Sequence, residues 1–248
     1  MSLHKTTKYL SLLCLIHLLS YSCSVDKTKS HKPVHQFKLT DVTLLDGPFK
    51  KATELNKQVL LKYEPDRFLA KFRSEAGLEP KAEHYEGWES ETLAGHSLGH
   101  YLSACALMYR TSGDRQFLDK VSYIVNELET CQDADGSGYI GAFPNGKEIL
   151  ENEVAKGDIR SQSFDLNGIW APFYTQHKIM AGLRDAYHLC ENQKALEVER
   201  KFADWLYTIT ENLNDEQVQL MLNCEHGGMN EVLADLYADT KNEKYLRL

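Results

Sequence analysis

A spacing that recurs three times constrains the fold of this chain more than any other feature of its sequence. Three tyrosines are each followed by a leucine nine residues later: Tyr109 and Leu118, Tyr187 and Leu196, Tyr237 and Leu246. In the first two units a second leucine stands nineteen residues after the tyrosine, at Leu128 and Leu206. Each unit reads as a helix, a short polar turn and a second helix. Helical hairpins of this kind bury their apolar faces by stacking on one another.

The remaining pattern predicts an all-α chain. Apolar periodicity predicts helices over 48–63, 92–111, 115–131, 174–191, 194–211 and 228–240, with a further start at 242. The first of these should end before Pro65, and no alternating run predicts strands. Two long segments, 132–173 and 212–227, interrupt the repeat. Unequal spacing favours an α/α toroid, in which long loops at one end form the pocket, over a uniform solenoid.

The stretch CEHGGMNEVLADLY, residues 224–237, places a histidine and two glycines before an amphipathic helix. Gly227 and Gly228 would let the backbone turn tightly and let another group come close. His226 is either a packed side chain or part of a pocket wall. The positive end of the helix dipole disfavours imidazolium there, and a neutral imidazole both donates and accepts, which suits a sugar hydroxyl.

The N-terminus predicts export. Lys5 and Lys8 precede the apolar run YLSLLCLIHLL, which has the length of a signal-peptide core and is too short to span a bilayer. Cys23 follows a small residue and is a candidate for lipid attachment, although Ser20 departs from the usual leucine. We expect a signal peptide over 1–23, a polar tether over 24–37, and a periplasmic or outer-membrane lipoprotein of a bacterium.

Charge and cysteine usage exclude several classes of protein. A net charge of −8 argues against a nucleic-acid partner, because phosphate contact needs a basic face. Four cysteines follow the predicted signal peptide, without a CxxC pair: Cys105, Cys131, Cys190 and Cys224. That spacing predicts neither a zinc knuckle nor a disulfide scaffold. Three of the four sit in apolar helical patterns, which favours small core residues. The loop that begins at Asp133 has Pro144 at its twelfth position, where a calcium loop needs glutamate.

His96 and His100 lie one turn apart in AGHSLGHYL and share a helix face, which is a geometry that zinc uses. Gly95 and Gly99 have the same spacing on a neighbouring face and favour close helix packing instead. We therefore predict no metal site here, and keep both histidines as candidates for pocket lining.

Several long motifs occur in one order and resemble a known family: LLDGPFKKA, PDRFLAKFRSEAGL, YEGWESETLAGHSLGHYLSACALMY, TCQDADGSGYIGAF, YTQHKIMAGLRDAY and CEHGGMNEVLADLY. From about residue 38 to Leu248 the chain is similar to the N-terminal part of the bacterial β-L-arabinofuranosidases, glycoside hydrolase family 127, and of its sister family 146. The resemblance implies an (α/α)6 barrel, of which residues 38–248 would supply about half, as a truncated catalytic domain.

The resemblance also implies functional residues. Its histidines that contact the furanose ring match His177 and His226, which makes an arabinofuranosyl oligo- or polysaccharide the expected partner. The family's nucleophile is a cysteine thiolate bound to zinc, assisted by a glutamate, and those groups match nothing before Leu248. We therefore expect zinc in full-length members, no catalytic residue or metal in this chain, and no activity of the chain alone. Cys224 is rejected as a nucleophile because it lacks a second zinc ligand.

Further candidates for pocket lining are Trp170, Tyr174 and Glu231, with core packing, or helix-dipole compensation for Glu231, as the alternative. Ordinary glycosidases use two carboxylates, and the available ones are Asp133, Asp135, Asp165, Glu225 and Glu231. Two other functions fit an α/α toroid. One is an unsaturated-uronyl hydrolase, which needs basic residues for its substrate, and the other is a non-catalytic carbohydrate-binding or scaffold protein.

Overall fold

The computed structural model describes residues 35–90, 92–225 and 227–248. The predictions for the signal peptide, for Cys23 and for His226 therefore lie outside the described residues. By its internal contacts the chain consists of two compact units, with the boundary between Lys38 and Leu39. Every helix and strand named below belongs to the second unit, Leu39–Leu248. Within the described ranges no helix has both the length and the apolar content needed to cross a membrane.

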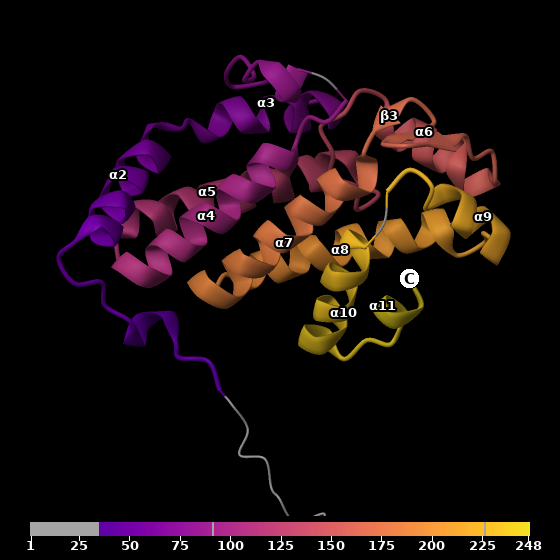
Figure 1. Ribbon diagram of the computed structural model, residues 1–248. Coiled ribbons are helices and arrows are strands. Elements are labelled where there is room, and N and C mark those ends of the chain that lie inside the picture. The colour runs from indigo at the N-terminus through magenta and orange to yellow at the C-terminus, as the bar shows by residue number, and fades with distance from the viewer. Residues whose placement is uncertain (1–34, 91, 226) are drawn as a thin grey trace, which may run out of the picture. The chain divides into compact units, whose positions relative to one another are not determined.

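Three helical hairpins account for the repeat (Figure 1). They are α4 (His96–Ser112) with α5 (Arg115–Asp135), α7 (Pro172–Cys190) with α8 (Gln193–Thr210), and α10 (Gly228–Thr240) with α11 (Lys244–Arg247). Each turn has a residue with positive φ and then an Asp or Asn: Gly113 and Asp114, Glu191 and Asn192, Lys241 and Asn242. The Asp or Asn side chain accepts a backbone N–H of the following helix. One helix thus ends and the next begins within a few residues, which explains the constant spacing.

Glycines let α4 and α7 lie side by side (Figure 1). A Cβ on Gly99 would lie 2.2 Å from the carbonyl oxygen of Lys178, and one on Gly182 would lie 2.7 Å from that of Gly99. The predicted close approach at Gly99 is confirmed. Close packing also holds at Gly95, where a Cβ would lie 2.9 Å from the Phe72 ring. Gly95 has a second role, because its φ of +105° is not helical and the helix starts only after it. For this reason α4 begins at His96 and not near residue 92.

Some elements were not predicted. The helix α2 (Pro48–Lys62) ends as expected, but Pro65 opens α3 (Pro65–Glu75), because proline is well accepted in the first turn of a helix. The two long segments contain α6 (Gly146–Asn152), η4 (Val154–Lys156) and α9 (Asp215–Met221). They also contain an antiparallel sheet of β1 (Ser161–Gln162), β2 (Asp165–Leu166) and β3 (Ile169–Trp170). Strands of two residues are too short to show alternation.

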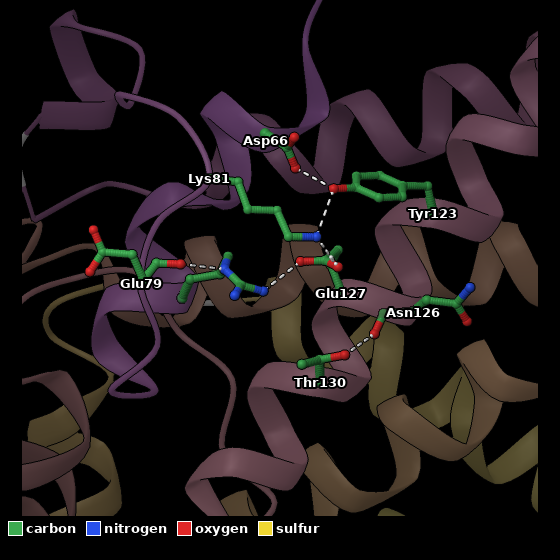
Figure 2. Close-up of polar contacts among 8 residues, drawn as sticks. Asp66, Glu79, Lys81, Tyr123, Asn126, Glu127 and Thr130 are labelled. Carbon is green, nitrogen blue, oxygen red and sulfur yellow. Dashed lines mark hydrogen bonds and ion pairs between the residues drawn. The ribbon is translucent and has the colours of Figure 1, made fainter.

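A polar network fastens the connection between α3 and α4 (Figure 2). The Glu127 carboxylate accepts from Arg73 at 2.7 Å and from Lys81 at 2.6 Å. Lys81 also donates to the Tyr123 hydroxyl at 3.1 Å, and that hydroxyl donates to Asp66 at 2.5 Å. The network holds a loop that continues into the 3-10 turn η3 (Gly87–Ser90).

Candidate functional site

His177 and Glu231 connect α7 to α10. The His177 Nε2 atom lies 3.3 Å from Glu231 Oε2, and the histidine is buried while the glutamate side chain is 72% exposed. Gly227 turns the chain into α10 with a φ of +94°, and a Cβ on Gly228 would lie 3.0 Å from the His177 ring. The prediction of a tight turn and a close approach at these glycines is confirmed, and the group that approaches is His177.

Burial lowers the pKa of His177, Lys178 lowers it further, and Glu231 opposes both in part. The imidazole is therefore neutral at pH 7, with one nitrogen that donates and one that accepts. Glu231 lies in the first turn of α10 as predicted, where its charge complements the helix dipole. The pair can exchange hydrogen bonds with a hydroxyl group without burying a net charge.

Two cavities meet at His177. Trp170, Tyr174 and His177 line the larger one, of about 920 Å³, whereas His100, His177 and Glu231 line the smaller one, of about 300 Å³. These are five of the seven residues that the sequence singled out for binding or pocket lining. The sixth, His96, is buried and lines neither cavity. The seventh, His226, lies outside the described residues, although its chain neighbours Glu225 and Gly227 line the larger cavity.

Glu225 caps α7 from a distant part of the chain. Its carboxylate accepts the backbone N–H of Phe173 at 2.5 Å and also that of Tyr174. Ala171, which precedes the helix, has a φ of +45° and no side chain that could cap it. Burial raises the pKa of Glu225, and the two N–H groups lower it in part. Its role is thus to fix the N-terminal turn of the helix that carries His177.

A second capping acid, Glu89, is buried and was not singled out by the sequence. Its carboxylate accepts the backbone N–H groups of Gly95 and Ser97 at 2.9 and 3.2 Å, and lies 3.1 Å from His96 Nδ1. Burial alone would lower the pKa of His96, but the contacts with Glu89 and with the Leu93 carbonyl outweigh it, and the pKa is raised. His96 is therefore a structural partner of Glu89 at the start of α4.

Aromatic rings form a row beside these residues. Trp170 and Trp88 have ring centroids 6.3 Å apart, Trp88 lies 6.0 Å from His96, and His96 lies 5.9 Å from Tyr174. The Tyr174 hydroxyl is 3.2 Å from His100 Nε2. Trp88 was missed by the sequence reasoning, although the motif YEGWES contains it; its exposure gave no periodic signal.

Phe164 occupies the two-residue turn between β1 and β2 with a φ of +61° and is 62% exposed. A bulky residue in this conformation costs on the order of 1–3 kcal/mol. Its backbone N–H donates to the Cys224 carbonyl at 2.9 Å, and its side chain lines the larger cavity. Strain of this kind is characteristic of functional surfaces.

The described residues do not fit a catalytic zinc site. They contain no group of three His, Cys, Asp or Glu side chains that could hold a metal. Cys105 and Cys131, within predicted helices, are buried as expected for core residues, and Cys190 is only half-buried. Cys224, outside the predicted helices, is buried too. Burial first, and then Glu225 and Asp165, raise the pKa of Cys224 to about 12, so the thiol carries no nucleophilic charge at pH 7.

The candidate carboxylates each have a structural partner. Asp133 pairs with Lys201 at 3.1 Å, Asp135 pairs with Lys147 at 2.8 Å, and Asp165 accepts the backbone N–H of Gly168 at 3.2 Å. Glu225 caps α7 and Glu231 contacts His177. Each of these five carboxylates is therefore in contact with a lysine, a histidine or a backbone N–H group.

Comparison with known proteins agrees with this architecture. Residues 41–248 match the family described as "Beta-L-arabinofuranosidase, GH127 catalytic domain". No curated protein sequence matched the chain.

A similar fold occurs in the crystal structure of Ara127N, a GH127 β-L-arabinofuranosidase from Geobacillus stearothermophilus T6. The TM-score is 0.57 at 16% identity, over 83% of this chain and 31% of that one. At this identity the likeness shows the fold, and it confirms the predicted all-α toroid. The chain spans about a third of the length of that relative.

Proposed function

This chain belongs to the β-L-arabinofuranosidase family GH127, and we propose that its His177 wall, formed by His177 and Glu231, binds the terminal arabinofuranosyl unit of plant glycans. The observation that supports this role is the neutral, buried imidazole of His177, which lines both cavities and lies 3.3 Å from an exposed carboxylate. A sugar hydroxyl needs a donor and an acceptor side by side, and this pair provides them. His226, three residues before Met229 in α10, would supply a second imidazole to the same ring.

The described residues bind and orient the sugar in this proposal, and they do not attack it. The zinc and cysteine thiolate that the resemblance implies have no donor set among them. The Cys224 thiol is held protonated by its high pKa, and the candidate acids are engaged with structural partners. We therefore expect the chain alone to bind arabinofuranosides without hydrolysing them.

We also propose that the protein is exported by a bacterium and is attached to the cell envelope by lipid at Cys23. The support is the order of the N-terminal sequence, in which basic residues, an apolar run and a cysteine follow one another. An envelope location suits a protein whose substrate is a polymer outside the cell.

Equilibrium binding to methyl β-L-arabinofuranoside tests the sugar site. His177→Ala should weaken binding about two- to tenfold, which corresponds to one hydrogen bond of about 0.5–1.5 kcal/mol. The matched control is His188→Ala, which removes a histidine from the other end of α7, where it pairs with Asp239. Equal affinity of the wild type and the His177 variant would contradict the proposal. Preference for an unsaturated uronide would favour the uronyl hydrolase instead.

A further inference from the structure

Three exposed aromatic side chains gather at the larger cavity and have no part in the His177 wall. Trp88 is 64% exposed, Phe164 is 62% exposed and Trp170 is 37% exposed. They come from three separate elements, namely η3, the turn between β1 and β2, and β3. All three line the cavity of about 920 Å³. We propose that Trp88, Phe164 and Trp170 form a second sugar subsite, which holds the residue linked to the terminal arabinofuranose.

Backbone contacts hold the chain segments that carry Trp88 and Trp170. The Trp170 N–H donates to Thr92 Oγ1 at 3.0 Å, which ties β3 to the segment that follows Trp88. Lys71 donates to the carbonyl of Ser90 at 2.7 Å, and Glu89 caps α4, so the turn next to Trp88 is held on both sides. Backbone segments that are already in place lose little conformational freedom on binding.

One buried ring, that of His96, links the three exposed aromatic side chains to the helix that carries His177. The buried His96 ring stands between Trp88 and Tyr174, with centroids 6.0 and 5.9 Å from theirs. Tyr174 precedes His177 by three residues on α7, close to one helical turn. In this proposal a sugar ring at His177 would leave the three exposed aromatic rings uncovered, and a chain of two sugars would reach both.

The side chains around Trp88, Phe164 and Trp170 suit a neutral sugar. Aromatic faces pack against the C–H groups of a sugar ring, and the hydroxyls need a few polar partners around its edge. Ser163, Asn223 and Asn230 line the same cavity and offer a hydroxyl and two amides. Arg247 is the one lysine or arginine among the described residues that line it, so an anionic sugar would find a single cation.

The test compares two ligands, and it rests on the proposed function because both carry β-L-arabinofuranose. One is methyl β-L-arabinofuranoside, and the other is a disaccharide that ends in a β-L-arabinofuranosyl unit. The wild-type chain should bind the disaccharide more tightly. Trp88→Ala should weaken disaccharide binding roughly three- to tenfold, as expected for one aromatic contact, and leave methyl arabinofuranoside binding unchanged.

Trp88→Phe should keep most of the preference, because the aromatic plane remains. Phe49→Ala, which removes a 77% exposed ring from α2, is the matched control and should change neither affinity. Equal binding of both ligands by the wild type, or an equal effect of Trp88→Ala on both, would overturn the subsite while His177-dependent binding stands. Failure to bind either ligand would overturn the proposed function and the subsite together.

Discussion

The Nε2 atom of His177 lies 3.3 Å from Oε2 of Glu231, so a buried ring on α7 is in direct contact with an acid on α10 that solvent reaches. This contact raises the pKa of His177 against the lowering effects of burial and Lys178. The protonation of a buried ring is thereby coupled to a surface carboxylate.

Glu231→Gln should lower the pKa of His177 further, because the substitution removes the negative charge that favours imidazolium. NMR titration of the His177 ring protons measures the shift. The stability of the fold should change by less than about 1 kcal/mol, since the Glu231 side chain is largely exposed. The matched control is Asp235→Asn, one turn further along α10, where the acid pairs with Arg184 at 3.1 Å. An equal shift in both variants would indicate a general field effect and no specific contact.

Gly99→Ala should destabilise the protein by about 1–3 kcal/mol or more, because the new Cβ would lie 2.2 Å from the backbone oxygen of Lys178. Gly228→Ala is the comparison, since its Cβ would meet the His177 ring at 3.0 Å and a side chain can shift more easily than backbone. Denaturant unfolding of both variants tests whether Gly99→Ala lowers the free energy of unfolding more than Gly228→Ala does. A larger loss for Gly228→Ala would mean that the backbone contact between α4 and α7 is relieved more easily than the contact with the His177 ring.

The free energy of unfolding should decrease as the pH rises, because the side chain of Glu199 is buried. Both of its carboxylate oxygens are buried without a hydrogen-bond partner in the described part of the chain. Burial, and then Asp239, raise its pKa well above the ordinary value. The folded state therefore keeps a proton that the unfolded chain loses near pH 4, and stability is full below that pH and declines above it until the folded pKa is passed.

Glu199→Gln should remove this decline and have a higher free energy of unfolding than the wild type at pH 8, because the buried amide has no proton to lose. Denaturant unfolding between pH 4 and pH 8 measures the effect. Glu197→Gln, an exposed acid on the same helix, should leave the pH profile unchanged. A wild type with flat stability across this range would show that Glu199 is solvated or paired in solution.

Cys23→Ala should release the mature protein from bacterial membranes into the soluble periplasm, because the predicted lipid has no other attachment point. Fractionation and the mass of the N-terminal peptide check this outcome. Cys14→Ala, within the apolar run, is the control and should not change the distribution. A Cys23 variant that stays in the membrane fraction, with no lipid mass on the wild-type peptide, would disprove lipidation.

The chain alone should not turn over a chromogenic β-L-arabinofuranoside, with or without zinc. The physical reason is the pKa of about 12 of the buried Cys224 thiol and the absence, within the described ranges, of a donor set for zinc. Steady-state assays of the wild type and Cys224→Ser measure it. Zinc-dependent turnover that Cys224→Ser abolishes would show that this cysteine is the nucleophile after all.

The sequence predicted the long helices well, because a helix that stacks on its neighbours must repeat its apolar residues. It also identified the turn at Gly227 and the close approach at Gly99, since glycine at such positions has a steric reason. It could not predict that Glu225 caps α7 or that Glu89 caps α4. Glu225 bonds to a backbone group 52 residues earlier in the chain, and Glu89 bonds to groups six and eight residues later. Contacts of this kind leave no periodic mark in a sequence.

The same limit applies to the site. Tyr174, His177 and Glu231 could be singled out from motifs, whereas Trp88 and Phe164 could not. Nothing in a sequence distinguishes an exposed aromatic residue that lines a cavity from one that does not. The strained φ of Phe164 is visible in coordinates and not in a sequence. His226 stays a prediction outside the described residues.

The recurring turn, in which a left-handed residue precedes an Asp or Asn cap, also bears on how the chain folds. Each turn is closed by groups two or three residues apart, so each pair of helices is joined through local contacts. Proteins rich in local contacts cross their folding barrier quickly. The slow step of folding should then be the packing of α4 against α7 at Gly99 and Gly182, after the hairpins have formed. Substitutions at these two glycines should therefore slow folding more than substitutions in the turns.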